Sequence, residues 1–108
     1  MNGLLRVCAD PWGMVAYTYI LASRPHGAIY IGSTVDLRAR VEQHRSGRGG
    51  VHTARYGIGT LVWFEVHQAL RDAQAREYLL KRWRRTWKDA LIGGVNPGWR
   101  DVSRDIPY

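Results

Sequence analysis

The sequence predicts an α/β domain, because three short β-rich runs are separated by longer stretches whose apolar residues recur at helical spacing. The β-rich runs are residues 15–21, 28–31 and 61–66. The predicted helices span about residues 34–45, 72–81 and 86–92. A chain of 108 residues is large enough for one modest core and too small to divide.

The first two β-rich runs are predicted to form an antiparallel hairpin. Residues 15–21 are rich in β-branched and aromatic side chains, and the turn that follows contains Pro25 and Gly27. Because side chains alternate along a strand, Tyr17 and Tyr19 share one side of the first strand.

A strand-to-helix junction follows the hairpin. The second run stops at Gly32, and Ser33 with Asp36 three residues later indicates a helix start. We expect the helix to cover about residues 34–45 and to end at Ser46 and Gly47, because glycine readily adopts the left-handed cap conformation.

This junction is predicted to bring three functional side chains together. Arg40 and His44 are four residues apart and therefore share one helix face. The turn before the helix places its start close to Tyr30, at the end of the strand. A guanidinium, an imidazole and a phenol would then converge.

The rest of the chain is predicted to hold one loop, one strand and two helices. The loop at residues 48–59 contains four of the twelve glycines, and such backbones can approach a phosphate closely. Residues 61–66 are expected to be the most buried strand. Helix formers continue from residue 72 to about residue 85, and Thr86 is the expected N-cap of a short helix that ends at Gly93 and Gly94.

Composition favours a polyanionic partner. Lys and Arg number 16 against 9 Asp and Glu, so nucleic acid or an acidic membrane surface is expected as the partner.

The single Cys8 excludes an intramolecular disulfide. No signal peptide and no run of roughly 18 apolar residues is visible, which favours a cytoplasmic protein without membrane contact. We expect a loose leader at residues 1–13, one domain at 14–103 and a tail at 104–108.

Basic residues gather in two clusters. Those around the first helix and the glycine loop are Arg38, Arg40, Arg45, Arg48 and Arg55. Those along the later helices are Arg76, Lys81, Arg82, Arg84, Arg85 and Lys88, with Trp83 and Trp87 between them. Any one of these cations is better explained as part of a solvated helix face. As a group they indicate phosphate contact, because so many like charges repel without a counter-charge.

The carboxylates show no pair with the clustering that a two-metal phosphodiesterase requires. Glu77 is the notable one, since its helical spacing from Ala73 and Leu80 allows it to point toward the sheet. An exposed ion pair with Lys81, four residues on, is the alternative that the residues alone favour.

The four histidines show no metal-binding spacing, and no Gly-x-Ser-x-Gly motif is present. These residues indicate a basic domain that binds nucleic acid, without defining a reaction.

Several spaced motifs carry a resemblance to a known family. Tyr17-Thr18-Tyr19 and Tyr30-Ile31-Gly32, ten residues apart, resemble the paired tyrosine motifs of the GIY-YIG nuclease superfamily. The similarity continues through Asp36-Leu37-x-x-Arg40-x-x-x-His44 and through residues 52–56, 61–65, 75–77, 81–88 and 96–101. The chain is most similar to the small single-domain bacterial group of this superfamily.

That resemblance implies a small three-stranded, mainly antiparallel sheet flanked by helices, with motif residues around a divalent metal and a scissile phosphate. Glu77 would be the single protein ligand of Mg²⁺ or Mn²⁺, and Arg40 would stabilise charge on the phosphate. Tyr19, Tyr30 and His44 would surround the attacking water.

Tyr19 is the favoured base, relayed or assisted by His44. A phenol with its ordinary pKa of about 10 needs that pKa lowered, which Arg40, Lys81 or the metal would supply. His44, with an ordinary pKa of about 6.5, needs no such help.

The expected nucleic-acid contacts are Arg38, Arg48, Arg55, Tyr56, Lys81, Arg84, Arg85 and Asn96. Asn96 is also expected to help hold the site closed. Two departures from the family pattern stand out. Tyr17 and Thr18 replace the Gly and Ile of the first motif, and Ser33-Thr34 stands where some relatives carry a lysine, whose role would fall to Lys81 or Arg55.

The resulting functional hypothesis is a metal-dependent endonuclease that acts on DNA, with RNA as the alternative substrate. Larger family members attach a DNA-recognition domain, and none is visible here, so we expect phosphate and shape recognition with little base reading. Branched, nicked or single-stranded DNA is the expected substrate, in repair or recombination, with specificity supplied by a partner protein as a further option. The alternatives are a non-catalytic nucleic-acid-binding module and, more weakly, a protein bound to acidic lipid.

Overall fold

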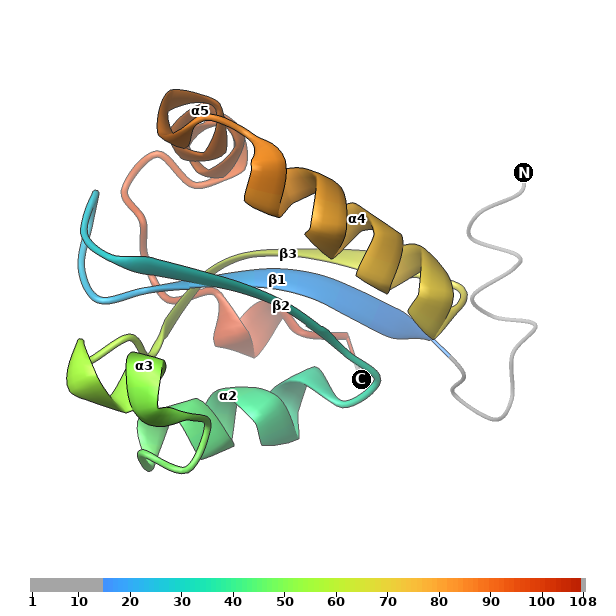
Figure 1. The fold of residues 1–108 in the computed structure, drawn as a ribbon, viewed down its shortest axis with the longest axis horizontal. Coiled ribbons are helices and arrows are strands. Elements are labelled where there is room, and N and C mark those ends of the chain that lie inside the picture. The colour runs from blue at the N-terminus through green and yellow to red at the C-terminus, as the bar shows by residue number, and fades with distance from the viewer. Residues whose placement is uncertain (1–14, 108) are drawn as a thin grey trace.

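The computed structural model describes residues 15–107, except for the side chains of residues 51 and 52. Three strands form one antiparallel sheet with helices on both faces (Figure 1). The central strand is β1 (Ala16–Ala22), with β2 (Ile29–Thr34) on one side and β3 (Thr60–His67) on the other. The expected α/β class and three-stranded antiparallel sheet are therefore confirmed. The expected leader at residues 1–13, with Cys8, lies outside the described residues.

Strand β1 is buried along its whole length because both of its faces are covered. Tyr17, Tyr19 and Leu21 face α2 (Leu37–Arg45), beside which lies the short α3 (Val51–Arg55). Ile20 and Ala22 face the other layer, formed by α4 (Leu70–Arg82) and α5 (Arg85–Val95). The expectation that residues 61–66 form the most buried strand is wrong, since β3 lies at an edge of the sheet.

The strand-to-helix junction lies later in the chain than the sequence indicates. β2 continues through Gly32 because Ser33 still pairs with Thr18 in the sheet. The N-cap is Asp36 rather than Ser33, and its carboxylate accepts a 3.1 Å hydrogen bond from the backbone N–H of Ala39. Helix α2 therefore begins at residue 37, and it ends at Ser46 and Gly47 as expected.

The later elements differ in detail from their expected bounds. The loop at residues 48–59 contains α3. The helical ladder of α4 breaks at Trp83, whose backbone is extended. Helix α5 has Arg84 as its N-cap rather than Thr86, and it passes through Gly93. Two successive glycines do not end α5, because the i to i−4 bonds continue up to the Asn96 N–H.

The C-terminal segment completes the core on the α2 side. The Val102 N–H donates to the Leu61 carbonyl, and Ile106 is buried beside Leu37 and Val41. Residues beyond position 103 therefore contribute to this core. Within the described part of the chain, no helix is both long enough and apolar enough to cross a membrane.

Candidate active site

Two tyrosines lie on the α2 side of the sheet, where the sequence predicts the first part of the site. The register pairs Tyr19 with Gly32, and the ring centroids of Tyr19 and Tyr30 are 6.2 Å apart. A Cβ atom at Gly32 would lie 2.6 Å from the Tyr19 hydroxyl oxygen and 3.0 Å from the Tyr30 ring. Only glycine fits at position 32, because the Tyr19 hydroxyl lies directly against the neighbouring strand.

Helix α2 brings His44 and Arg40 to the same place. His44 is 3% exposed, and its Nε2 lies 3.4 Å from the Tyr19 hydroxyl oxygen. The His44 ring centroid is 4.9 Å from that of Tyr30. The positive charge of Arg40, one turn earlier on α2, acts on the Tyr19 hydroxyl. The four predicted residues of the hairpin and first helix therefore converge.

Glu77 reaches the same edge of the sheet from α4. Ser33 faces the opposite side of β2 from Gly32, and its hydroxyl donates a 2.5 Å hydrogen bond to Glu77 Oε1. Lys81 Nζ lies 2.6 Å from Oε2. The ion pair favoured by the residues alone is present, and Glu77 nonetheless turns toward the sheet. Its charge acts on the Tyr19 hydroxyl, so it lies within electrostatic range of the tyrosines.

The surroundings of Glu77 fit a divalent ion that has a single protein ligand. The Glu77 side chain is 22% exposed, so water and phosphate oxygens have access to complete a coordination shell. Within residues 15–107, no group of three or more His, Cys, Asp or Glu side chains is arranged to hold a metal. Glu77, which is paired with Lys81 in this structure, is the carboxylate at this sheet edge that could hold Mg²⁺ or Mn²⁺.

Burial decides the protonation states of the site. It raises the pKa of Tyr19 well above its ordinary value, helped by Tyr30 and Glu77, and the opposing charge of Arg40 does not reverse this. Burial and then the Arg40 charge lower the pKa of His44 below 6.5. Arg40 thus acts on the Tyr19 pKa in the expected direction, but burial outweighs it, and the protein holds a protonated phenol beside a neutral imidazole.

Thr53 and Gly49 lie behind the imidazole, and neither is predicted from the sequence to belong to the site. Thr53 Oγ1 is 3.0 Å from His44 Nδ1. A Cβ atom at Gly49 would overlap the His44 ring. The sequence signal for Thr53 is weak, since it is one polar residue of a short helix that the sequence presents as a loop.

The expected nucleic-acid contacts on the α2 side are exposed. Arg48 and Arg55 help line an open hollow of about 600 Å³ beside α3, and Tyr56 is 52% exposed at the end of that helix. Arg38 is also exposed, and its guanidinium donates to the Ile106 carbonyl at 2.6 Å. Three cations and one aromatic ring are therefore exposed on this side.

The residues expected to contact nucleic acid on the α4–α5 side already interact with other parts of the protein. Lys81 pairs with Glu77, and Arg84 lies over the Trp87 ring at 5.4 Å. Arg85 donates to Asp89 at 2.7 Å and to the Gly27 carbonyl at 2.5 Å. All three cations remain exposed, so phosphate contact is open to them.

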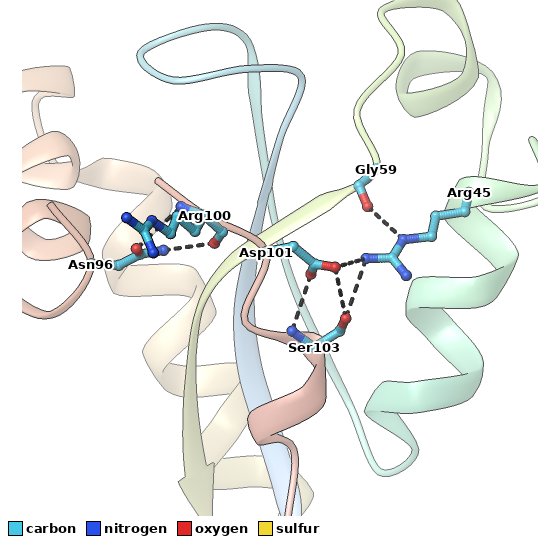
Figure 2. A network of polar contacts seen from close by, with 6 residues as sticks. All are labelled: Arg45, Gly59, Asn96, Arg100, Asp101 and Ser103. Carbon is cyan, nitrogen blue, oxygen red and sulfur yellow. Dashed lines mark hydrogen bonds and ion pairs between the residues drawn. The ribbon is translucent and has the colours of Figure 1, made fainter. Parts of the chain in front are cut away.

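Asn96 does not join this surface. It is 8% exposed, and its side-chain N–H groups donate to the carbonyls of Val62 and Arg100 at 2.9 and 2.8 Å. Its carbonyl oxygen accepts from the Arg100 N–H (Figure 2). The expectation of a nucleic-acid contact at Asn96 is therefore corrected: the amide is used fully in holding the C-terminal segment against β3.

A second polar network anchors α2 next to His44, and the sequence does not predict it. Figure 2 shows Arg45 donating to the Gly59 carbonyl, to Asp101 and to Ser103. Burial alone would raise the pKa of Asp101, but the Ser103 and Arg45 hydrogen bonds hold it below its ordinary value. An ionised Asp101 thus ties the C-terminal segment to the helix that carries the site.

Comparison with known proteins identifies the family. The model of the GIY-YIG catalytic domain matches residues 15–90, which covers both tyrosine strands, α2 and Glu77. The chain therefore belongs to the GIY-YIG family.

Within that family the chain is similar to small bacterial UPF0213 proteins. It is 38% identical to UPF0213 protein CPE1444 of Clostridium perfringens, over 83% of this chain and 96% of the relative. A UPF0213 protein of Streptococcus pneumoniae is 35% identical over 71% of this chain and 77% of its own. The solution structure of UPF0213 protein BH0048 from Bacillus halodurans superposes with a TM-score of 0.51 at 28% identity, covering 84% and 96% of the two chains.

Proposed function

We propose that the protein is a divalent-metal-dependent endonuclease that hydrolyses phosphodiester bonds in DNA with little sequence specificity. The observation that carries this proposal is the convergence of Tyr19, Tyr30, Arg40 and His44 at the sheet edge, with Glu77 in electrostatic range. A carboxylate, a guanidinium and a neutral base are what hydrolysis of a phosphodiester needs.

In the proposed reaction, Arg40 binds the scissile phosphate and stabilises the charge that develops on it. Water attacks phosphorus as the bond from phosphorus to the leaving sugar oxygen breaks, and that oxygen takes a proton from solvent. The attacking water passes a proton to the Tyr19 oxygen, while Tyr19 passes its own hydrogen to His44 Nε2. This relay needs no phenolate, which suits the raised pKa of Tyr19. A divalent ion on Glu77 would supply Lewis-acid chemistry by neutralising phosphate charge.

Substrate binding is proposed to rest on phosphates and nucleic-acid shape. The net charge of +7 and the exposed Arg38, Arg48 and Arg55 on the α2 side support this. Branched, nicked or single-stranded DNA is the proposed substrate, with repair or recombination in the cytoplasm as the setting.

The test is a cleavage panel of plasmid, single-stranded, nicked and branched DNA, with a matched RNA, each with and without Mg²⁺ or Mn²⁺. Glu77→Ala should abolish metal-dependent cleavage. Glu65→Ala is the matched control, because Glu65 is also an ion-paired, partly exposed carboxylate but lies on β3 and pairs with Arg76. No cleavage under any condition, or equal cleavage by Glu77→Ala, would contradict the proposal.

A non-catalytic nucleic-acid-binding module is the second candidate, and one observation favours it. Both Glu77 oxygens already have protein partners, Ser33 and Lys81, so the carboxylate is stable without a metal. In that case binding would persist, weaken steeply with salt and lead to no cleavage.

A further inference from the structure

On the buried side of its ring, His44 is hydrogen-bonded to Thr53 through Nδ1. Thr53 is 1% exposed, and its Oγ1 lies 3.0 Å from His44 Nδ1 and 3.3 Å from the Gly50 carbonyl oxygen. We propose that Thr53 fixes the tautomer of His44, keeping the ring hydrogen on Nδ1 so that Nε2 is free to accept the Tyr19 proton. The catalytic consequence rests on the proposed function, whereas the tautomer does not.

The hydrogen-bond capacity of Thr53 supports this direction. A hydroxyl has one hydrogen, and a carbonyl can only accept. If the Thr53 hydrogen went to His44 Nδ1, the Thr53 and Gly50 oxygens would face each other at 3.3 Å with no hydrogen between them, so we assign that hydrogen to the bond with the Gly50 oxygen. That oxygen also accepts from the Ala54 N–H at 3.1 Å, which its two lone pairs allow. The remaining contact then requires His44 Nδ1 to donate. A neutral imidazole has one ring hydrogen, so Nε2 is the acceptor.

The Tyr19 side gives the same answer independently. The positive charge of Arg40 acts on the Tyr19 oxygen, which favours turning the Tyr19 hydrogen away from the guanidinium and toward another acceptor. The His44 Nε2 atom is 3.4 Å away. A hydrogen on Nε2 would instead leave the Tyr19 oxygen facing both that hydrogen and the Arg40 charge, with its own hydrogen directed away from both.

Two further features keep the ring in this state. Burial and the Arg40 charge lower the pKa of His44, so the imidazole is neutral and has a defined tautomer. Gly49 lies against the ring, leaving no room for a side chain. Thr53 is therefore a positioning residue: it holds the proton acceptor ready without touching substrate.

The experiment is nuclear magnetic resonance of the full chain with ¹⁵N-labelled histidine near pH 8, where the imidazole is neutral. His44 is identified by the signals lost in His44→Gln. The expected wild-type spectrum has a protonated Nδ1 and an unprotonated Nε2. Thr53→Val has nearly the same shape without an acceptor, and it should move the hydrogen toward Nε2, the form that free imidazole prefers. Thr53→Ser should keep the wild-type tautomer.

A hydrogen on Nε2 in the wild type, or on Nδ1 in Thr53→Val, would overturn the proposal. If Thr53→Val does not fold, Tyr19→Phe provides the test: the hydrogen stays on Nδ1 if Thr53 fixes the tautomer, and a move to Nε2 overturns the proposal.

In cleavage assays, Thr53→Val should lower kcat about ten- to a hundred-fold with KM little changed, and Thr53→Ser should restore kcat. A wild-type protein that cuts nothing would refute the proposed function and leave the tautomer result standing.

Discussion

The two faces of the sheet use their buried polar groups differently. On the α4–α5 face, the Thr18 hydroxyl donates to the Ala73 carbonyl at 2.8 Å, and the Asn96 amide is bound by backbone carbonyls. These side chains join one element to the backbone of another. The rest of that buried cluster is apolar, with Ile20, Leu80 and their neighbours.

On the α2 face, three buried side chains are bonded to one another instead. Tyr19 contacts His44, and His44 contacts Thr53. Bonds between side chains are a minority of the hydrogen bonds in folded proteins. Neighbouring residues of one strand, Tyr19 and Ile20, therefore face layers of different composition. The α2 layer bonds buried polar side chains to one another, whereas the α4–α5 layer buries mainly apolar side chains and carries Glu77 at its partly exposed edge.

The largest expected effect is on the α2 face. Tyr19→Phe removes one hydroxyl from the proposed relay, so cleavage should fall about 10²- to 10⁴-fold while the fold is retained. The measurement is kcat on the preferred substrate of the panel. Tyr78→Phe is the control, because that tyrosine is 62% exposed on α4. Similar activity in the two variants would contradict the proposed division between the faces.

On the other face the effect should be on stability. Ile20→Ala leaves a cavity at a residue that is 0% exposed, so the free energy of unfolding should fall by about 2–5 kcal/mol. Urea denaturation measures this. The cleavage rate per folded molecule should not change. Val35→Ala, at a residue 60% exposed, should stay within about 0.5 kcal/mol of wild type. A lower rate per folded molecule in Ile20→Ala would show that the faces are coupled.

Gly32→Ala tests the close approach of β2 to the tyrosines. The new methyl group would overlap the Tyr19 hydroxyl, so we expect about 1–3 kcal/mol of destabilisation from overpacking, together with loss of cleavage. Denaturation and the cleavage assay measure the two effects. Full activity in this variant would mean that the Tyr19 hydroxyl need not lie where the structure places it.

Acid should weaken the α2 face through His44. The folded pKa is lowered below 6.5 by burial and by Arg40, so the unfolded chain binds the proton more readily. The contribution of His44 to the free energy of unfolding is complete above about pH 6.5 and is lost as the pH falls below that value.

The groups that face the His44 ring are Tyr19 and Tyr30 from the sheet and Arg40 on its own helix. Unfolding free energies at about pH 8 and about pH 5.5 should differ more in wild type than in His44→Gln. Equal differences would contradict the assignment.

The smallest expected effect is a gain in stability within helix α5. Gly93 lies inside α5, and no atom of another segment lies within 4 Å of the position that an added methyl group would take. Gly93→Ala should stabilise the protein by about 0.5–1 kcal/mol, because alanine loses less backbone entropy in a helix. A rise in the denaturation midpoint with unchanged cleavage is the expected result. A loss of stability would show that α5 needs flexibility at this point.

Much of the site is predictable because its signals are local. The two-residue period of β1 puts Tyr17 and Tyr19 on one face, and the four-residue spacing puts Arg40 and His44 on one face of α2. Each pattern describes one element by itself. The resemblance to a family then joins these elements to Glu77, which is 33 residues beyond His44 in the chain (77 − 44).

Other features are not predictable, because they depend on what a distant segment does. The sequence places Asn96 on the nucleic-acid surface, but its amide is fully bound by Val62 and Arg100. The sequence also makes Ser33 the N-cap, yet the sheet retains Ser33 and Asp36 takes the cap. Both residue types suit either place, so local propensity does not choose between them.

The sequence by itself determined the class of fold, the shared face of Tyr17 and Tyr19 and of Arg40 and His44, and the basic character of the protein. These follow from periodicity and composition, which are properties of neighbouring residues. The tertiary structure decided that β1 is central, that Thr53 meets His44, and that burial keeps Tyr19 protonated. Those facts depend on which segments pack together and how much water they exclude, and neither is a property of any single stretch of chain.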